Sequence, residues 1–149
     1  MSNFFTDGRL GLVAELQGDP EIDGRVKTWF DYGPGLARRH GLEPALCPVL
    51  AVAPAEGRPR PVANVERQVA QVLGVQVATD GADVAPCEEL AALVVARVQA
   101  ADATKLGLAA EGLTALRVPS VTWASHPRQD AARLIWAAEV EVELLWRRT

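Results

Sequence analysis

The cysteines and histidines are the residues of this chain best suited to act as nucleophiles, bases or metal ligands. Cys87 falls in the first turn of a predicted helix, where the helix dipole would lower the pKa of its thiol, but Glu88 and Glu89 act in the opposite direction. A Cys–His pair would also need His126 to arrive from a distant loop. Because chance alone supplies one cysteine and one histidine in a chain of this size, the pattern does not favour a nucleophilic enzyme.

Metal and nucleotide sites are not expected either. His40 and His126 lie far from each other and from the cysteines, without the short spacing that metal ligands show. Gly33–Gly35 begins like a phosphate-binding loop but lacks a third glycine at the required offset, and Pro34 has no N–H to offer. We therefore expect no bound metal and no organic cofactor, and we assign no catalytic residue.

Three glutamates alternate with apolar residues near the end of the chain. The acidic set is Glu139, Glu141 and Glu143, and the apolar set is Ala138, Val140, Val142 and Leu144. Such a row could serve in acid–base chemistry, but carboxylates along one face of a strand are more often solvated. Because like charges in a row repel one another, these side chains need basic partners, either across the strand in the same subunit or on a neighbour.

The same alternation, from Trp136 to Trp146, predicts a half-buried β-strand, because successive side chains of a strand point to opposite faces. A helix is the alternative, since Ile135, Val142 and Leu145 also fall on one helical stripe. The helix would place Val140 among the glutamates, so we favour the strand, with Val140 and Val142 in the core. A terminal strand of this length must pair with a central one.

The first half of the chain is expected to form one short helix and three strands. Leu10–Leu16 is apolar at helical spacing, with Asp7 as its N-cap, and Ile22–Gly24 is predicted to be a turn. The predicted strands are Arg25–Tyr32, Ala45–Ala53 and Asn64–Ala78. The second is a nearly continuous apolar run that should be buried on both faces, and the third should be bulged near Gly74.

The second half is expected to contain one long helix and a broken strand before the closing one. Pro86–Ala101 begins with proline and two glutamates and carries one apolar stripe, which predicts a helix packed on a sheet. Leu113–Val118 and Val121–Trp123 predict a fourth strand broken at Pro119, and Ala124–Ala132 a polar loop. This order predicts an α+β fold: a small, mostly antiparallel or mixed sheet of about four to five strands, with one long and one or two short helices.

The composition is that expected of a single soluble α+β domain spanning residues 1–149. A formal net charge of −4, from 19 acidic and 15 basic residues, does not favour electrostatic binding of nucleic acid or of a membrane. Apolar runs fall short of the roughly 20 residues that cross a bilayer, and we expect no secretory signal in Met1–Gly8. Cys47 and Cys87 are expected to be free thiols used as small core residues.

Tryptophans on polar segments are candidate contact residues. Trp29 falls on the polar side of its predicted strand, and Trp136 and Trp146 bracket the closing strand. Aromatic side chains near solvated carboxylates are typical of subunit interfaces, although these tryptophans could instead cap the ends of the core. The predicted subunit-interface set is Arg58, Arg60, Trp29, Trp136, Glu139, Glu141, Glu143 and Trp146.

The two arginines of that set lie in Pro54–Pro61, a segment rich in proline with almost no apolar residue to anchor it. Arg58 and Arg60, separated by one proline, would point the same way along an extended backbone. They could pair with the closing glutamates of a neighbouring subunit, or the segment could be a solvated loop.

In its order of elements the chain resembles the tail-terminator, or tail-completion, proteins of long-tailed bacteriophages and phage-derived particles. The shared pattern has a short N-terminal helix, a strand such as Arg25–Tyr32, a Pro-flanked apolar strand within Pro44–Val52 and a Pro/Gly-rich loop. A long strand ending at Asp80, one amphipathic helix and a closing strand of alternating charge complete it. The resemblance covers nearly the full length and lies in spacing more than in identity.

The resemblance implies a structural virion protein of the tail or neck, assembled in the host cytoplasm. Such subunits form a ring, usually a hexamer, that caps the tail tube and offers a surface to the head–tail connector or stopper protein. The implied partners are tail-tube and connector proteins, with no membrane, sequence-specific nucleic acid, cofactor or catalysis. The alternatives are another neck or head–tail joining protein, and a small cytoplasmic α+β enzyme or ligand-binding domain with Cys87 or the glutamates in a cleft.

Overall fold

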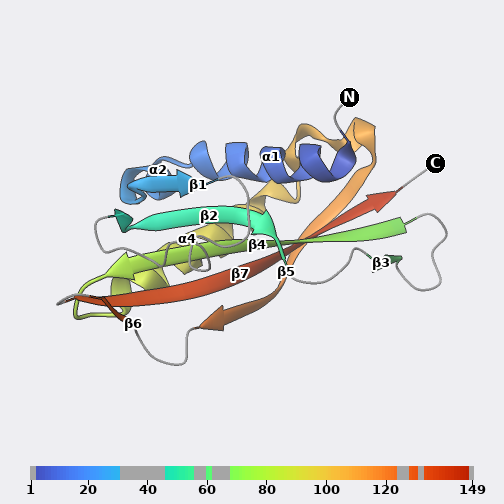
Figure 1. The fold of residues 1–149 in the computed structure, drawn as a ribbon. Helices are drawn as coiled ribbons and strands as arrows, with labels where there is room; N and C mark the ends of the chain where they lie inside the picture. Colours follow the sequence, from blue (N-terminus) through green and yellow to red (C-terminus); the bar gives the residue numbers. More distant parts are fainter. Residues whose placement is uncertain are drawn as a thin grey trace.

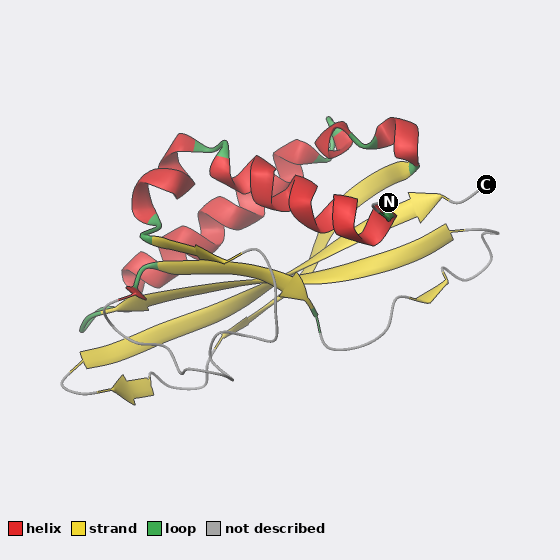
Figure 2. Ribbon diagram, turned by 45° about the horizontal axis from the view of Figure 1, so that its top comes forward, coloured by secondary structure: helices red, strands yellow, loops and turns green. Residues whose placement is uncertain are grey.

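The computed structural model describes residues 3–30, 46–55, 60–61, 68–123, 128–130 and 133–147. These segments form two layers, a twisted sheet and a set of helices that covers one of its faces (Figure 1). The turned view in Figure 2 shows the helices gathered on one side of the strands. The architecture is α+β, which confirms the predicted fold class.

The sheet is built around its two longest strands, β4 (Gln68–Asp80) and β7 (Arg133–Arg147), which pair antiparallel along their length. The main order is β1-β2-β4-β7-β5, with all pairs antiparallel except β1 with β2. The other strands are β1 (Thr28–Phe30), β2 (Val49–Pro54), β3 (Arg60–Pro61), β5 (Leu113–Trp123) and β6 (Arg128–Asp130). Short β3 pairs with β4, and short β6 pairs with β7. The predicted closing strand therefore lies inside the sheet.

The described helices are α1 (Phe4–Gln17), α2 (Pro20–Arg25) and α4 (Ala85–Ala101), followed by the 3₁₀ turns η2 (Lys105–Gly107) and η3 (Ala109–Glu111). The predicted long helix is confirmed as α4, with proline in its first turn and one buried stripe facing the sheet. In the connection that follows, Gly107 is the last residue of η2 and Gly112 comes directly after η3. Both adopt positive φ, at 71° and 107°, a conformation that favours glycine.

The start of α1 differs from the prediction. Asn3 is its N-cap, and the Asn3 side chain accepts a hydrogen bond from the Thr6 N–H at 2.9 Å. The predicted N-cap, Asp7, instead lies inside the first turn, where a negative charge is still favourable. The predicted helix, Leu10–Leu16, is therefore too short by about two turns.

The predicted turn at Ile22–Gly24 is wrong, since these residues belong to α2. Asp19 caps this helix by accepting hydrogen bonds from Glu21 N–H at 2.9 Å and Ile22 N–H at 3.4 Å, and Pro20 occupies the first turn. Ile22 is fully buried. The predicted strand Arg25–Tyr32 is correspondingly shorter, with β1 confined to Thr28–Phe30 within the described residues.

The predicted bulge at Gly74 is also wrong. Gly74 pairs in unbroken register with Ala53 on β2 and Glu141 on β7. A Cβ at this position would collide with the Glu139 carboxylate, so the glycine leaves room for a neighbouring side chain. The irregularities lie in β5, which runs through Pro119 as one strand with a register shift between Arg117 and Ser120.

The main core lies between the helices and one face of the sheet, here named the helix face. It includes Leu12, Leu16, Leu90, Val94, Leu73, Val75, Val140, Val142 and Leu144, all at most 1% exposed. The opposite face, here named the far face, carries Glu139, Glu141 and Glu143. β2 is buried on both faces, as predicted, because Val49 on its far face joins a second small cluster with Cys47, Ala78 and Ile135.

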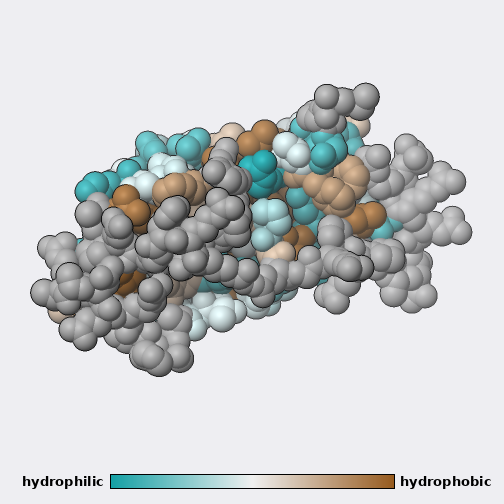
Figure 3. Space-filling model, viewed as in Figure 1, coloured by the Kyte–Doolittle hydropathy of each residue, from teal (hydrophilic) through white to brown (hydrophobic). Residues whose placement is uncertain are grey.

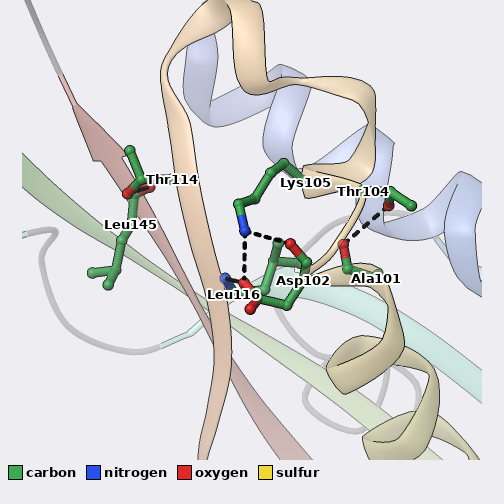
Figure 4. Close-up of polar contacts among 7 residues, drawn as sticks. All are labelled: Ala101, Asp102, Thr104, Lys105, Thr114, Leu116 and Leu145. Carbon is green, nitrogen blue, oxygen red and sulfur yellow. Dashed lines mark hydrogen bonds and ion pairs between the residues drawn. The ribbon is translucent and has the colours of Figure 1, made fainter.

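Asp102, directly after α4, joins the helix layer to the edge of the sheet (Figure 4). Its Oδ1 accepts a hydrogen bond from the Leu116 N–H at 2.8 Å and lies 3.5 Å from Lys105 Nζ. The hydrogen bond from Leu116 is the main cause that lowers the pKa of the Asp102 carboxyl, and Lys105 acts in the same direction.

Candidate interaction surface

The glutamate row lies on the far face, and two of its three members have partners across the strand in the same subunit. Glu143 is only 6% exposed, and its Oε1 accepts a hydrogen bond from Arg117 Nε at 2.6 Å. The Ser120 hydroxyl donates to Glu141 Oε2 at 2.6 Å. Arg117 and Ser120 are also the register partners of these glutamates on β5. The predicted need for a basic partner is therefore met within the subunit at Glu143. At Glu141 the partner within the subunit is a hydroxyl, which carries no charge.

Glu139 is the member of the row with the least internal support. Its side chain is half-buried and lies above Gly74, and among the described residues it faces no basic group. Its register partner on β5 is Thr122. Glu139 and Glu141 therefore leave two carboxylates on the far face that are not neutralised by cations in the described part of the chain.

Trp146 belongs to the core. It is fully buried, its Nε1 donates to Gln71 Oε1 at 2.9 Å, and the Gln71 amide in turn donates to the Phe5 carbonyl at 2.7 Å. The ring also makes an edge contact with Phe4, with centroids 5.2 Å apart. The prediction that Trp146 contacts another subunit is untested, but the side chain has no exposed surface in this subunit with which to do so.

The other predicted tryptophans are half-buried. Trp136 donates from Nε1 to the Gly81 carbonyl at 3.1 Å, and Trp29 packs against the main core from β1. Trp123, which was not among the predicted contact residues, is 43% exposed at the end of β5. Leu10 on α1 is similarly exposed, at 44%. Figure 3 shows polar and apolar residues interspersed over the described part of the surface in that view.

The side chains of the two arginines in the predicted contact set, Arg58 and Arg60, lie outside what the structure describes. Arg58 lies outside the described residues, and of Arg60 only the backbone in β3 is described. His40, His126 and Gly33–Gly35 also lie outside the described residues. The role of the Pro54–Pro61 segment therefore stays a prediction.

The cysteines lie in environments that disfavour the reactive thiolate. Burial raises the pKa of Cys47 to about 11, and the nearby Asp80 carboxylate adds to this effect. Burial likewise raises the pKa of Cys87, which is fully buried in the first turn of α4. Both thiols are free, as predicted. Their burial argues against the Cys–His nucleophile considered from the sequence, because a nucleophile needs access and a low pKa.

The described residues bring together no group of three or more His, Cys, Asp or Glu able to hold a metal ion. None of the helices described is long and apolar enough to cross a membrane.

Comparison with known proteins finds a likeness of fold but no match of sequence family. No protein-family model matches the chain, and no curated protein matches it. Among solved structures, the fold is similar to that of a chain described as "Virion of native gene transfer agent (GTA) particle", with a TM-score of 0.61 and 14% sequence identity. The match covers 94% of this chain and 94% of that chain. The two chains therefore share a fold over nearly their whole length.

Proposed function

We propose that this protein is a structural component of a phage-like particle and, within it, a ring-forming tail terminator. In this role it would cap the tail tube and join it to the head connector. The observation that carries the proposal is the shared fold with a chain of a gene transfer agent virion, because it extends over 94% of both chains. A local motif or common sub-fold would leave a larger part of one chain unmatched.

The finer assignment to a tail terminator rests on the order of elements in the sequence. That order of elements is realised here as α1, the apolar strand β2, the long strand β4, the single long helix α4 and the charged closing strand β7. In the described part of the chain these elements pack into one sheet-and-helix unit, whose faces and edges are the candidate contact surfaces.

Charge on the far face supports an assembly role. The Glu139 and Glu141 carboxylates need a basic partner that the described residues do not supply, and a neighbouring subunit or tube protein could provide one. Arg58 and Arg60 of a second copy remain the predicted source. Such contacts between exposed charges would be sensitive to salt.

The first experiment measures assembly. Purified protein, alone and with tail-tube protein from the same genome neighbourhood, is sized by light scattering coupled to gel filtration. We expect a ring near six times the 15.9 kDa subunit mass, or its formation on tube ends. A protein that stays monomeric under both conditions would contradict the ring function and favour the ligand-binding or enzyme alternative.

The second experiment tests the arginine segment. Replacing both Arg58 and Arg60 with Ser should leave the unfolding midpoint nearly unchanged, weaken assembly and make the remaining assembly less sensitive to salt. Arg25→Ser is the matched control, because Arg25 is an exposed arginine on α2 whose Glu89 partner lies in the same subunit at 3.0 Å. Assembly of the double variant like the parent at every salt concentration would exclude this segment from the joint.

The absence of a cofactor is tested separately. Native mass spectrometry and elemental analysis of the purified protein should give the bare polypeptide mass and no stoichiometric metal. A mass surplus that disappears on denaturation would contradict this expectation and reopen the enzyme alternative.

A further inference from the structure

The main strand order of the sheet ends in two edge strands. β1 forms one edge and β5 the other (Figure 1). An edge strand presents N–H and C=O groups that can pair with another chain. Natural proteins usually cover or interrupt such edges, so an uncovered stretch of edge is informative.

The first half of β5 is protected. The Leu113 N–H donates to the Leu108 carbonyl at 3.1 Å, and the Leu116 N–H donates to Asp102 at 2.8 Å. Pro119 then interrupts the edge, because it has no N–H and lies at the register shift. From Ser120 to Trp123 the strand is exposed or half-exposed, and the described residues provide no partner on its outer side.

This open stretch lies at the same level of the sheet as β1. Following the register across the strands, one row contains Trp29, Leu50, Val77, Ala138 and Trp123. The next row begins at Phe30 and ends at Thr122. The three residues of β1 and the four open residues of β5 are therefore matched in level and nearly in length.

Strand directions are also compatible. β1 is parallel to β2, and each later step across the sheet reverses direction, so β5 runs opposite to β1. If the sheet of one copy continued into the next, β5 would meet β1 of the second copy in an antiparallel pair. An antiparallel pair is the commoner and slightly more stable arrangement.

A tryptophan stands at each end of the shared row, on the same face. Leu50, Val77 and Ala138 all belong to the main core, so Trp29 and Trp123 both lie on the helix face. Joining the edges would place the two rings directly opposite each other. A cross-strand aromatic pair of this kind stabilises neighbouring strands, and it would cover the exposed ring of Trp123.

We propose that Ser120–Trp123 of one copy pairs antiparallel with β1 of a second copy, with Trp123 opposite Trp29. The contact uses different surfaces on the two partners, so it repeats from copy to copy and can close into a ring. The inference rests on the proposed ring function and specifies which surfaces build the ring.

The decisive test is disulfide trapping. In an antiparallel pair, opposite Cα atoms lie about 4.5–5.5 Å apart, within the range of a disulfide. Under mild oxidation, the double variant Trp29→Cys with Trp123→Cys should give a ladder of cross-linked species on non-reducing gels, ending at the ring. The control pair is Trp29→Cys with Ser120→Cys, which moves one thiol roughly 10 Å along the strand to the other face. The unsubstituted protein controls for buried Cys47 and Cys87.

A single substitution keeps the test independent of the half-buried Trp29. Trp123→Ser should fold normally, because 43% of the residue's surface is exposed and it lies at an edge of the sheet, yet raise the concentration for half-assembly at least tenfold. Leu10→Ser is the matched control, since Leu10 is equally exposed but lies on α1, and it should assemble like the parent.

Two results separate this inference from the proposed function. If the parent forms a ring while the Trp29–Trp123 pair cross-links no better than the control, or Trp123→Ser assembles normally, the edge contact is wrong and the ring function stands. If the parent forms no ring with or without tube protein, the proposed function fails and the edge contact fails with it.

Discussion

Side chains alternate between the two faces of β7, but different interactions hold the two faces. On the helix face, Val140, Val142 and Leu144 are fully buried between β7 and the helices. Among the glutamates of the far face, Glu139 and Glu141 are half-buried and Glu143 is closely covered by Arg117. Around these residues one face is held by packing of apolar surface and the other by a few cross-strand polar contacts, while Ile135, nearer the start of β7, joins the small apolar cluster of the far face.

This difference teaches where the subunit can tolerate change. A fully buried valine contributes about 1.5–3 kcal/mol through burial and fits a space that cannot adapt. On folding, a glutamate on the far face exchanges hydrogen bonds with water for a bond with a hydroxyl or a guanidinium. Its net contribution to stability is therefore much smaller than that of a buried valine. Substitutions around Val142 on the helix face should therefore cost more stability than substitutions at Glu139 or Glu141 on the far face.

The largest contrast is expected between Val142→Asp and Glu141→Gln. Val142→Asp should lower the free energy of unfolding by roughly 3–4 kcal/mol, because a carboxylate without a partner replaces buried apolar surface. Glu141→Gln should change it by less than about 0.5 kcal/mol. Chemical denaturation of both variants gives the comparison, and a reversed ranking would mean that the two faces of β7 are wrongly assigned.

One glycine on each side of the sheet gives a second contrast. A Cβ on Gly8 in α1 would lie 2.6 Å from Gln71 Oε1 and 2.9 Å from side-chain carbons of Leu144 and Trp146, so Gly8→Ala should cost about 1–3 kcal/mol. The three atoms nearest to a Cβ on Gly74 all belong to the Glu139 side chain, a flexible chain whose carboxylate end can shift. Gly74→Ala should therefore cost under about 1 kcal/mol in thermal or chemical unfolding. Equal costs would remove the distinction between a rigid and an adaptable face.

The Arg117–Glu143 pair tests the most buried part of the far face. Arg117→Ala should destabilise by about 1 kcal/mol, because it leaves a carboxylate that is 6% exposed without its partner, while the arginine's own 62% exposure limits the gain from pairing. Adding Glu143→Gln should recover part of that loss, since the amide carries no charge. A double-mutant cycle on unfolding free energies measures the coupling, and zero coupling would show that the pair contributes nothing.

The smallest effect is expected at Asp102, where the two layers meet. Its pKa is lowered in the folded protein, mainly by the Leu116 N–H, so its contribution to stability is present above the ordinary carboxyl pKa and is lost as the pH falls through the folded pKa. Asp102→Asn should therefore be slightly less stable than the parent at pH 7 and equal to it in strong acid. Unfolding curves over a pH series test this, and a gap between the two proteins that does not change with pH would contradict it.

Local patterns predicted the parts of the fold whose signal lies in neighbouring residues. The alternation around Val140 and the apolar stripe of α4 each follow from one element's geometry, so both were identified correctly. The signal for α2 was also present, in an aspartate followed by proline at Asp19–Pro20, and the turn prediction overlooked it. The bulge predicted near Gly74 was wrong because the reason for this glycine is the Glu139 side chain, which lies far away in the sequence.

The candidate contact residues show the same division. The sequence identified Glu139, Glu141 and Glu143 as one row and predicted that they need partners, and cross-strand partners were found for two of them. It could not rank the four tryptophans, because Trp146 and Trp123 have similar local surroundings on strands of mixed character. One is fully buried and the other is the most exposed tryptophan described.

The sequence by itself determined which side of the closing strand is apolar, since strand alternation assigns every second residue to the same face whatever the strand pairs with. Only the tertiary structure decided which strands are central and which are edges. The reason is that strand order depends on pairing between segments far apart in the chain, such as β4 with β7. Among the described strands, that order leaves Ser120–Trp123 without a partner at one edge and places Trp123 in line with Trp29 at the other.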